Sequence, residues 1–359
     1  MINSYSQLRR LTQPDKQKGA ALALLALVIL IVGATVLFSA LDSRGITIAR
    51  TKNTAAALAE AKMGLIGYAV LSAAKPGALP CTDNNNDGSA DTSGTNSCAA
   101  YIGRVPWKQL GISKLKDAVG ECLWYALSPI YRNQMTAATR TSNPLNGNTS
   151  GSITLVDDAG TPYSASINPV IAVIMAPGSP LAGQNRNGPT STCPGDSIAA
   201  KYLDSKGGIN NATGNVSGNN YTFKLGKIDS TFNDQFVYIT AKEFYRILRQ
   251  RMVKEVLGNV DVPSGPVNYF ISNGHYPCPA ATITGNEDCM LTTGFVPYND
   301  AALGPLQYAA LGIWLSSNGW YGLANYSYIS STHVKLNVTD GLGSYTCDAN
   351  INTFSCSSP

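Results

Sequence analysis

The sequence has few charged residues, almost no histidine and no CxxC pair. Charged side chains make up 13% of its 359 residues and hydrophobic side chains 44%, a balance that excludes a solvated, disordered chain. The net charge of +4 includes four basic residues within the first eighteen, so we expect no basic face that binds nucleic acid. With only His275 and His333 present, a zinc site would need thiolates alone, without the paired spacing typical of such sites.

The motifs of common hydrolases and nucleotide-binding enzymes are also missing. The sequence contains no GxSxG, HExxH or GxGxxG segment in a suitable context. His275 lies in a repeated segment where its counterpart is Ala78, and His333 opens a predicted strand. We therefore predict that the protein is not an enzyme. A calcium-dependent enzyme or a lectin stays open, because sugar-binding sites leave weak linear traces.

The cysteines number eight, and none lies in the apolar N-terminal stretch. An even count without metal-ligand spacing predicts disulfides formed in an oxidising compartment. The eight are Cys81, Cys98, Cys122, Cys193, Cys278, Cys289, Cys347 and Cys356.

Residues 20–41 form an apolar stretch without charge or proline. At about 1.5 Å per residue, a helix of this length just spans a ~30 Å hydrocarbon core. It is longer than the apolar region of a secretory signal peptide, and the basic residues before it place the N-terminus in the cytoplasm. Proline-free sequence continues to Leu71, and this predicts one helix that extends into the following domain. We expect its buried face to include Leu58, Met63, Leu65, Ile66, Tyr68 and Ala69.

The start of the chain resembles the class III signal of type IV prepilins. A short basic leader ends in Lys18-Gly19, and the hydrophobic helix follows without a spacer. The resemblance implies that a membrane-bound prepilin peptidase cuts between Gly19 and Ala20. The residues KGAAL are similar to the start of large minor pilins and of the tip pseudopilin of type II secretion. An ordinary signal-anchored protein is the alternative, because the leader motif is short.

One position departs from the major pilins. They carry Glu at the fifth mature position, where it is thought to pair with the N-terminal amine of a neighbouring subunit, whereas this chain has Leu24. A buried Glu costs several kcal/mol unless it is paired. A subunit at the fibre tip meets no such amine and loses nothing with Leu, so the resemblance implies a tip position.

The rest of the chain contains an internal repeat. The pattern GxxPC, a variable loop and then CxxxxGxVP-aromatic occurs at 77–107 and again at 274–298. Trp124-Tyr125 and Trp320-Tyr321 follow the two copies and are aligned with each other. Segments such as FNDQFVYIT resemble a family of large bacterial pilin-like proteins. The aromatic cluster after the second copy, Trp314, Trp320, Tyr321, Tyr326 and Tyr328, is expected to pack in the core rather than form a binding patch.

The patterning predicts an α+β fold with two pilin-like lobes, each a helix with an antiparallel sheet. Thr240 and Glu243 predict a capping box for an amphipathic helix that ends near Gly258. Strands are expected at 122–131, 169–176, 326–331 and 334–338, a hairpin at 153–165 and a flexible surface loop at 205–220. The predicted parts are a leader at 1–19, a membrane and filament-core segment at 20–52, and lobes at 53–239 and 240–359.

Short loops are the cheapest to close, so we expect bridges Cys81–Cys98 and Cys278–Cys289. The resemblance to pilins implies a terminal bridge Cys347–Cys356. Cys122 and Cys193 are then left for each other, and their bridge would tie the first sheet to the loop at 184–196.

The loop after Cys81 has oxygen-bearing residues at alternate positions. Asp83, Asn85 and Asp87, a turn glycine in sixth place and Asp91 in ninth match the first part of an EF-type calcium loop. The Glu expected in twelfth place is replaced by Gly94. Related pseudopilins hold calcium, so the resemblance favours a calcium site, whereas the residues alone are equally compatible with a polar turn.

The resemblance implies a minor, tip-located subunit of a type IV pilus or type II secretion-like pseudopilus. Its partners would be other pilin subunits, the inner membrane, the peptidase and a surface or protein target. It would sit in the inner membrane with a periplasmic head, and later in an extracellular filament. A membrane-anchored adhesin outside any filament is the first alternative, and an extracytoplasmic enzyme the second.

Overall fold

The computed structural model describes residues 49–163, 169–186, 193, 196–258, 264–303 and 311–358. The chain divides into two compact units, 1–52 and 53–359, and the second contains nearly all described residues. The expected leader, the membrane stretch 20–41, the cleavage residues Gly19 and Ala20, and Leu24 lie outside the described residues.

The described part of the N-terminal helix runs over Ala49–Leu71, and one of its faces is buried. Leu58, Ala61, Leu65 and Ala69 are at most 4% exposed, and their spacing of three or four residues places them on one side of a helix. Met63 is 73% exposed. The expectation that Met63 belongs to the buried face is wrong, because it lies two residues from both Ala61 and Leu65 and so points away from them.

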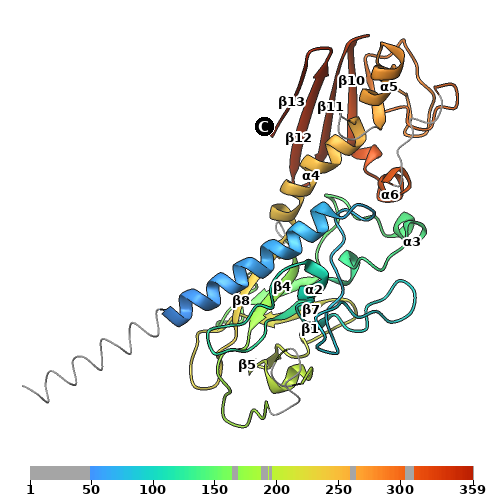
Figure 1. Ribbon diagram of the computed structural model, residues 1–359. Helices are drawn as coiled ribbons and strands as arrows, with labels where there is room; N and C mark the ends of the chain where they lie inside the picture. The colour runs from blue at the N-terminus through green and yellow to red at the C-terminus, as the bar shows by residue number, and fades with distance from the viewer. Residues whose placement is uncertain are drawn as a thin grey trace, which may run out of the picture. The chain divides into compact units, whose positions relative to one another are not determined.

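The helix packs beside a six-stranded sheet (Figure 1). The sheet path is β1 (Ile102–Arg104), β2 (Trp124–Leu127), β4 (Val170–Ala176), β3 (Ile153–Val156) and β7 (Tyr221–Lys224), and β8 (Gln235–Thr240) also pairs with β4. Only the β3–β7 pair is parallel. All seven residues of β4 are buried, as the continuous apolar run predicts.

Three segments of this lobe differ in detail from expectation. The strand expected at 122–131 is shorter, because the 3-10 turn Pro129–Tyr131 follows β2. At 153–165, β3 turns at Asp157, and the returning arm, as far as it is described (to Tyr163), forms an isolated bridge between Pro162 and Val156 rather than a strand. The loop at 205–220 contains the hairpin β5 (Ser205–Lys206) and β6 (Ile209–Asn210). Asn211, which is fully buried, anchors it, whereas most of the other residues of the loop are exposed, as expected of a surface loop. The short helices α2 (Trp107–Leu110), α3 (Ala137–Ser142) and η2 (Ala199–Lys201) complete the lobe.

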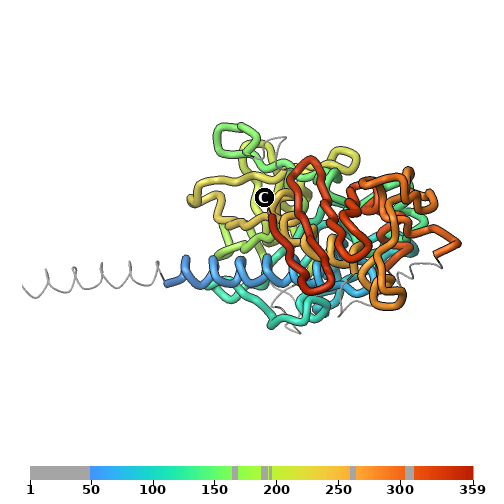
Figure 2. The backbone as a smooth tube through the Cα atoms, turned by 90° about the horizontal axis from the view of Figure 1, so that it is seen from above, coloured from blue at the N-terminus to red at the C-terminus, as the bar shows by residue number. Residues whose placement is uncertain are grey.

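The second sheet is antiparallel throughout and has the order β13-β12-β11-β10-β9. Its strands are β9 (Thr293–Gly294), β10 (Ala324–Ser330), β11 (His333–Asp340), β12 (Gly343–Asn350) and β13 (Thr353–Ser357). Figure 2 shows the last strands as consecutive hairpins that lead to the C-terminus. Helices α4 (Ala241–Leu257), α5 (Gly265–Asn273) and α6 (Leu311–Ser317) and the turn η3 (Tyr321–Leu323) belong to the same part of the chain.

Helix α4 begins and ends where the sequence predicts. The Thr240 hydroxyl accepts a 3.3 Å hydrogen bond from the backbone N–H of Glu243, which satisfies one of the free N–H groups of the first turn. Gly258 follows the last residue. Helix α5 was not predicted, although it directly precedes the second GxxPC segment.

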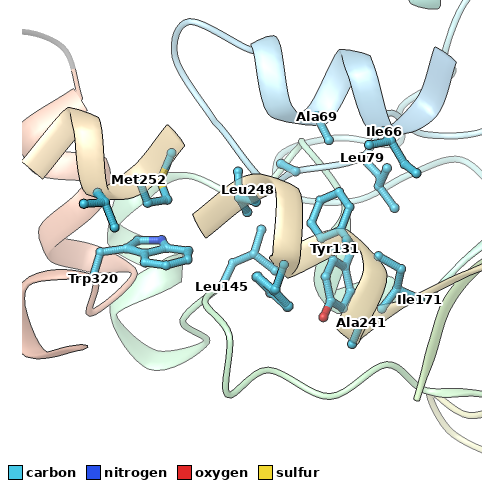
Figure 3. Close-up of a cluster of buried hydrophobic side chains, with 14 of the residues drawn as sticks. Ile66, Ala69, Leu79, Tyr131, Leu145, Ile171, Ala241, Leu248, Met252 and Trp320 are labelled. Atoms are coloured by element: carbon cyan, nitrogen blue, oxygen red, sulfur yellow. The ribbon is translucent and has the colours of Figure 1, made fainter. Parts of the chain in front are cut away.

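One apolar core runs through both sheets. It joins Leu65 and Ala69 of the N-terminal helix, Ile171 of β4, residues of α4 such as Leu248, and Trp320. Figure 3 shows side chains from these elements meeting around α4. A second cluster, which includes Trp124, Val173 and Phe223, lies in the first lobe. Apart from the hairpin β5–β6, the strands up to Thr240 belong to the first sheet and those after it to the second. Because one core packs against both sheets, the division into lobes at 239/240 stays an interpretation.

The two copies of the repeat share the same backbone contacts. Asp83 and Arg104 exchange reciprocal N–H···O=C bonds of 3.0 and 2.7 Å, and Ala280 and Phe295, at the matching positions, exchange bonds of 2.8 and 2.9 Å. A side chain on the preceding Gly103 would come within 2.8 Å of Thr82. One on Gly294 would come within 2.4 Å of the Ala280 carbonyl. Both glycines are thus required by the same close crossing of chain segments.

The aromatic residues of the two copies match differently from the expected alignment. Tyr125 lies opposite Gly103 in β2, and Tyr326 lies opposite Gly294 in β10. Each tyrosine hydroxyl donates to the carbonyl of the proline before the first cysteine, at 3.3 Å for Tyr125 and 3.0 Å for Tyr326. Tyr326, and not Tyr321, is therefore the counterpart of Tyr125. The five aromatics include Trp314, Trp320, Tyr321 and Tyr326 in the buried core and Tyr328 packed against it, as expected.

Candidate functional site

The N-terminal helix is the element that bears on the predicted membrane anchor. By length and composition alone, Ala49–Leu71 is apolar enough to cross a bilayer, and it is the one such helix among the described residues. Its buried residues, however, belong to the core of the second unit, so a role as the core helix of the head accounts for its apolar face. The predicted span at 20–41 lies outside the part of the chain that the structure describes.

Four disulfides close the head. They join Cys81–Cys98, Cys122–Cys193, Cys278–Cys289 and Cys347–Cys356, the same four pairs that the sequence predicts. Disulfides of this density are typical of proteins that fold in an oxidising compartment.

A buried arginine lies close to the Cys122–Cys193 bridge. The Arg104 guanidinium lies between the rings of Trp124 and Tyr202, 4.2 and 4.3 Å from their centroids. Its Nη1 donates a 2.7 Å hydrogen bond to the Cys122 carbonyl. Burial lowers the pKa of Arg104 to about 10, so it keeps its charge at neutral pH. The cation therefore fixes the segment around Tyr202 onto the first sheet.

The predicted calcium loop is closed by its own carboxylates. Asp83 is buried, and its two oxygens accept hydrogen bonds from the backbone N–H groups of Asn86 (2.6 Å), Asp87 (3.2 Å) and Gly88 (2.7 Å). Asp91 accepts from the backbone N–H of Asn84 at 2.6 Å and of Asn85 at 3.0 Å. Asn85 accepts from the backbone N–H of Asp87 at 2.9 Å, and Asp87 from that of Ser89 at 2.7 Å, so all four predicted ligands accept hydrogen bonds from backbone donors.

The surroundings of this loop explain its shape and its charges. Gly88 lies on Trp107, where a side chain would come within 2.5 Å of the indole. Burial raises the pKa of Asp83, although its three N–H donors oppose that shift. The N–H of Ser89 lowers the pKa of the exposed Asp87. Calcium binding by Asp83, Asn85, Asp87 and Asp91 stays a prediction, and an ion would compete with the donors that now hold Asp83.

One other group of metal-ligand residue types lies close together among the described residues: Cys278, Glu287 and Cys289. The two cysteines form a disulfide, and Glu287 accepts a 3.0 Å hydrogen bond from the backbone N–H of Cys278. Because both cysteines are in the disulfide, this group offers no thiolate to a metal. The Glu287 carboxylate closes the loop between the two cysteines.

Among the described residues, the hydrogen-bonding contacts of the two histidines are with a carbonyl and a carboxylate. The Nδ1 of His275 lies 3.2 Å from the Tyr276 carbonyl. His333 Nε2 lies 2.7 Å from Asp348 Oδ1, and Asp348 is the cross-strand neighbour of Ser355. Asp348, rather than His333, is thus the cross-strand neighbour of Ser355, whereas a serine nucleophile requires an imidazole beside its hydroxyl.

Two buried carboxylates form an unexpected pair in the first lobe. Asp204 and Asp234 each accept a hydrogen bond from the other's backbone N–H, at 3.2 and 2.9 Å. Burial, together with the charge of Asp204, raises the pKa of Asp234 to about 7. Among the described residues, Oδ1 of Asp234 has no hydrogen-bond partner. Both acids are more than 95% buried, so their charge state bears on stability.

A pocket in the second lobe is the feature that sequence reasoning missed. It encloses about 420 Å³ between α5, one residue of α4 and the turn from β12 to β13. Its lining residues come from 254, 267–276 and 349–354, segments that are far apart in sequence. Three of the lining residues, Ile271, Ile351 and Phe354, are large apolar side chains that the structure exposes. The sequence shows these residues, but it does not show that the fold brings them together.

Comparison of the chain with models of known families, with curated proteins and with solved structures finds no match.

Proposed function

We propose that this chain is a minor, tip-located subunit of a type IV pilus or a type II secretion-like pseudopilus. One observation carries the proposal. The helix Ala49–Leu71 buries one face in a disulfide-bonded head, and the uncharged stretch 20–41 precedes it along the chain, separated from it by residues 42–48. A helix that serves both as head core and as a continuation of an apolar anchor suits a subunit that packs through its helix and presents its head.

Several features support the finer points of this proposal. The repeated backbone contacts of the two GxxPC copies are compatible with two pilin-like lobes. Leu24 in place of Glu suits a subunit that meets no partner amine. In this proposal the protein is not an enzyme. It is processed by a prepilin peptidase, moves from the inner membrane to the extracellular fibre and contacts other pilin subunits.

An anchored adhesin outside any filament is the second candidate. The pocket of the second lobe favours it, because a binding surface on the head needs no fibre to act. The two candidates differ in processing and in location.

The test combines processing with location. Co-expressed with a prepilin peptidase, the chain should start at Ala20 by mass spectrometry and appear at low copy in sheared fibres. Gly19→Leu should block cleavage, because the peptidase must fit the chain closely there. Gly33→Leu, inside the apolar stretch, is the matched control and should be processed normally. A chain that keeps Met1 and stays in membranes would overturn the filament proposal and leave the adhesin.

A further inference from the structure

The final strand leaves one edge of the second sheet uncovered. Among the described residues, β13 pairs with β12 alone, and Figure 1 shows it at the outer edge of the sheet. An antiparallel neighbour uses the backbone groups on one side of a strand, so alternate N–H and C=O groups of β13 face outward. The opposite edge strand, β9, has only two residues, whereas β13 has five.

Strand β13 lacks the features that usually protect an edge. Its sequence, Thr-Phe-Ser-Cys-Ser, has no charge and no proline, and its register with β12 has no bulge. The Cys347–Cys356 disulfide joins residues directly opposite each other in the two strands. The bridge therefore holds β13 extended before a partner arrives, which lowers the entropy lost on binding.

The apolar pocket lies next to the start of this strand. The rings of Phe270 and Tyr276 stack at 4.6 Å between centroids and form part of its wall. Ile351 and Phe354, at its rim, are 62% and 40% exposed. Large exposed apolar side chains around a cavity are typical of a binding surface.

The charge of the pocket specifies its ligand further. Lys254 is the one charged residue among the described residues of its lining, none of which is acidic. Among the described residues, no carboxylate forms an ion pair with Lys254. The opposite face of β13 is polar, since Ser355 and Ser357 lie there. A complementary strand would thus be apolar on one face, polar on the other, and acidic near Lys254.

We propose that β13 and this pocket bind an extended segment of another protein. The segment adds a strand to the sheet, inserts an apolar side chain beside Phe354 and brings a carboxylate to Lys254. Backbone pairing supplies affinity, and the pocket supplies selectivity. A second copy of this chain is disfavoured, because the edge strand that it would bring, β13, has no carboxylate for Lys254. The inference concerns the second lobe alone and does not require a filament.

The test uses the full chain in nanodiscs and a panel of labelled eight-residue peptides. The peptides have the form T-x-T-x-T-x-T-D, with Val, Ile, Leu or Phe at x, and binding is measured by fluorescence anisotropy. We expect saturable binding of at least one peptide. N-methylation of its alternate backbone amides should abolish binding, because it removes the donors that pair with β13.

The charge is tested by a swap. Lys254→Glu should weaken binding at least tenfold, and a peptide with Lys in place of the final Asp should restore it. Lys335→Glu, on the opposite face of the same sheet, is the matched control and should leave the affinity unchanged.

Three results would overturn the inference. They are no saturable binding by any peptide, binding that survives N-methylation, or equal weakening by Lys254→Glu and Lys335→Glu. Sedimentation that shows dimers broken by Phe354→Asp would assign the edge to a second copy instead. Failure of any of these tests leaves the cleavage at Gly19 unaffected, so the two proposals fail separately.

Discussion

The hydroxyl of Tyr326 donates a 3.0 Å hydrogen bond to the carbonyl oxygen of Pro277. Both residues are buried, and Tyr125 makes the equivalent bond to Pro80 in the other copy. Each bond joins a strand, β2 in the first copy and β10 in the second, to the proline before the first cysteine of that copy. It therefore fastens each copy internally, through the proline of GxxPC and a tyrosine that the repeat pattern does not include.

Tyr326→Phe removes this donor and leaves a buried carbonyl without its partner. We expect the free energy of unfolding to fall by about 1–2 kcal/mol, measured by urea titration, and Tyr125→Phe to behave similarly. Tyr163, which is 60% exposed, is the control, and its change to Phe should cost less than about 0.5 kcal/mol. Wild-type stability of both core variants would show that the bonds contribute nothing.

The ion pair between Arg249 of α4 and Asp340 of β11 is bidentate, with distances of 2.8 and 2.6 Å. The two side chains are 4% and 0% exposed. Asp340→Ala leaves the guanidinium buried without its partner and should cost about 3–5 kcal/mol. Arg249→Met combined with Asp340→Ala should cost less than Asp340→Ala alone, because no uncompensated charge remains.

The control for this pair is the more exposed bridge between Lys62 and Glu243. Glu243→Gln should cost no more than about 1 kcal/mol, as partly exposed pairs usually do. If the double variant is less stable than Asp340→Ala, the buried-charge explanation is wrong.

Asp83 should stabilise the loop after Cys81 without any ion. In chelator, Asp83→Ala removes the acceptor of three backbone N–H groups and should lower the free energy of unfolding by about 2–4 kcal/mol. Asp87→Ala, in the same loop but exposed, is the control and should cost much less. A harmless Asp83→Ala would show that the loop closes by other contacts.

The same variants test calcium. A melting temperature that rises in millimolar calcium over chelator, and that Asp87→Ala abolishes, would establish the predicted site. Affinity should then be on the order of 10⁻⁴ to 10⁻³ M, since the loop lacks a twelfth-place Glu. Equal melting in both conditions would leave a turn closed by Asp83.

Stability should depend on pH through Asp234. Its folded-state pKa of about 7 exceeds the unfolded value near 3.9, so the folded state binds the proton more tightly. Protonation of Asp234 therefore adds to the free energy of unfolding, and this contribution is fully present below about pH 4. It is lost as the pH rises toward 7. The difference corresponds to about 4 kcal/mol.

Asp234→Asn keeps an oxygen for the donors from Asp204 and Asn211 and cannot ionise. We expect it to flatten the slope of stability between pH 4 and 7 and to stabilise the protein at pH 7. Asp229→Asn, on the surface, should leave that slope in place. A wild-type slope in Asp234→Asn would assign the pH dependence to other groups.

Local signals in the sequence predicted local structure well. The run at 169–176 predicted the buried β4, because a strand covered on both faces needs apolar residues throughout. Thr240 and Gly258 predicted both ends of α4. Helix α5 was missed because it begins with Gly265-Pro266 and has only nine residues, so turn signals outweighed its short apolar pattern.

Features that depend on distant contacts could not be predicted. The spacing from Gly294 to Tyr326 exceeds that from Gly103 to Tyr125, so aligning Trp-Tyr pairs gave the wrong counterpart. The hydrogen bonds of Asp83 depend on how the chain turns at Gly88, which the alternate pattern of oxygens does not reveal. The pocket requires α5 and the β12–β13 turn to meet, and no single segment carries that information.

The Cys122–Cys193 bridge also limits how far the chain can be stretched. It spans 71 residues, which would otherwise extend by about 250 Å at 3.3–3.6 Å per residue. If the N-terminal helix is pulled while the head is held, this length stays locked even after the first sheet has given way. An oxidised head should therefore yield under load in short steps, and a reducing agent should add one step of about that length.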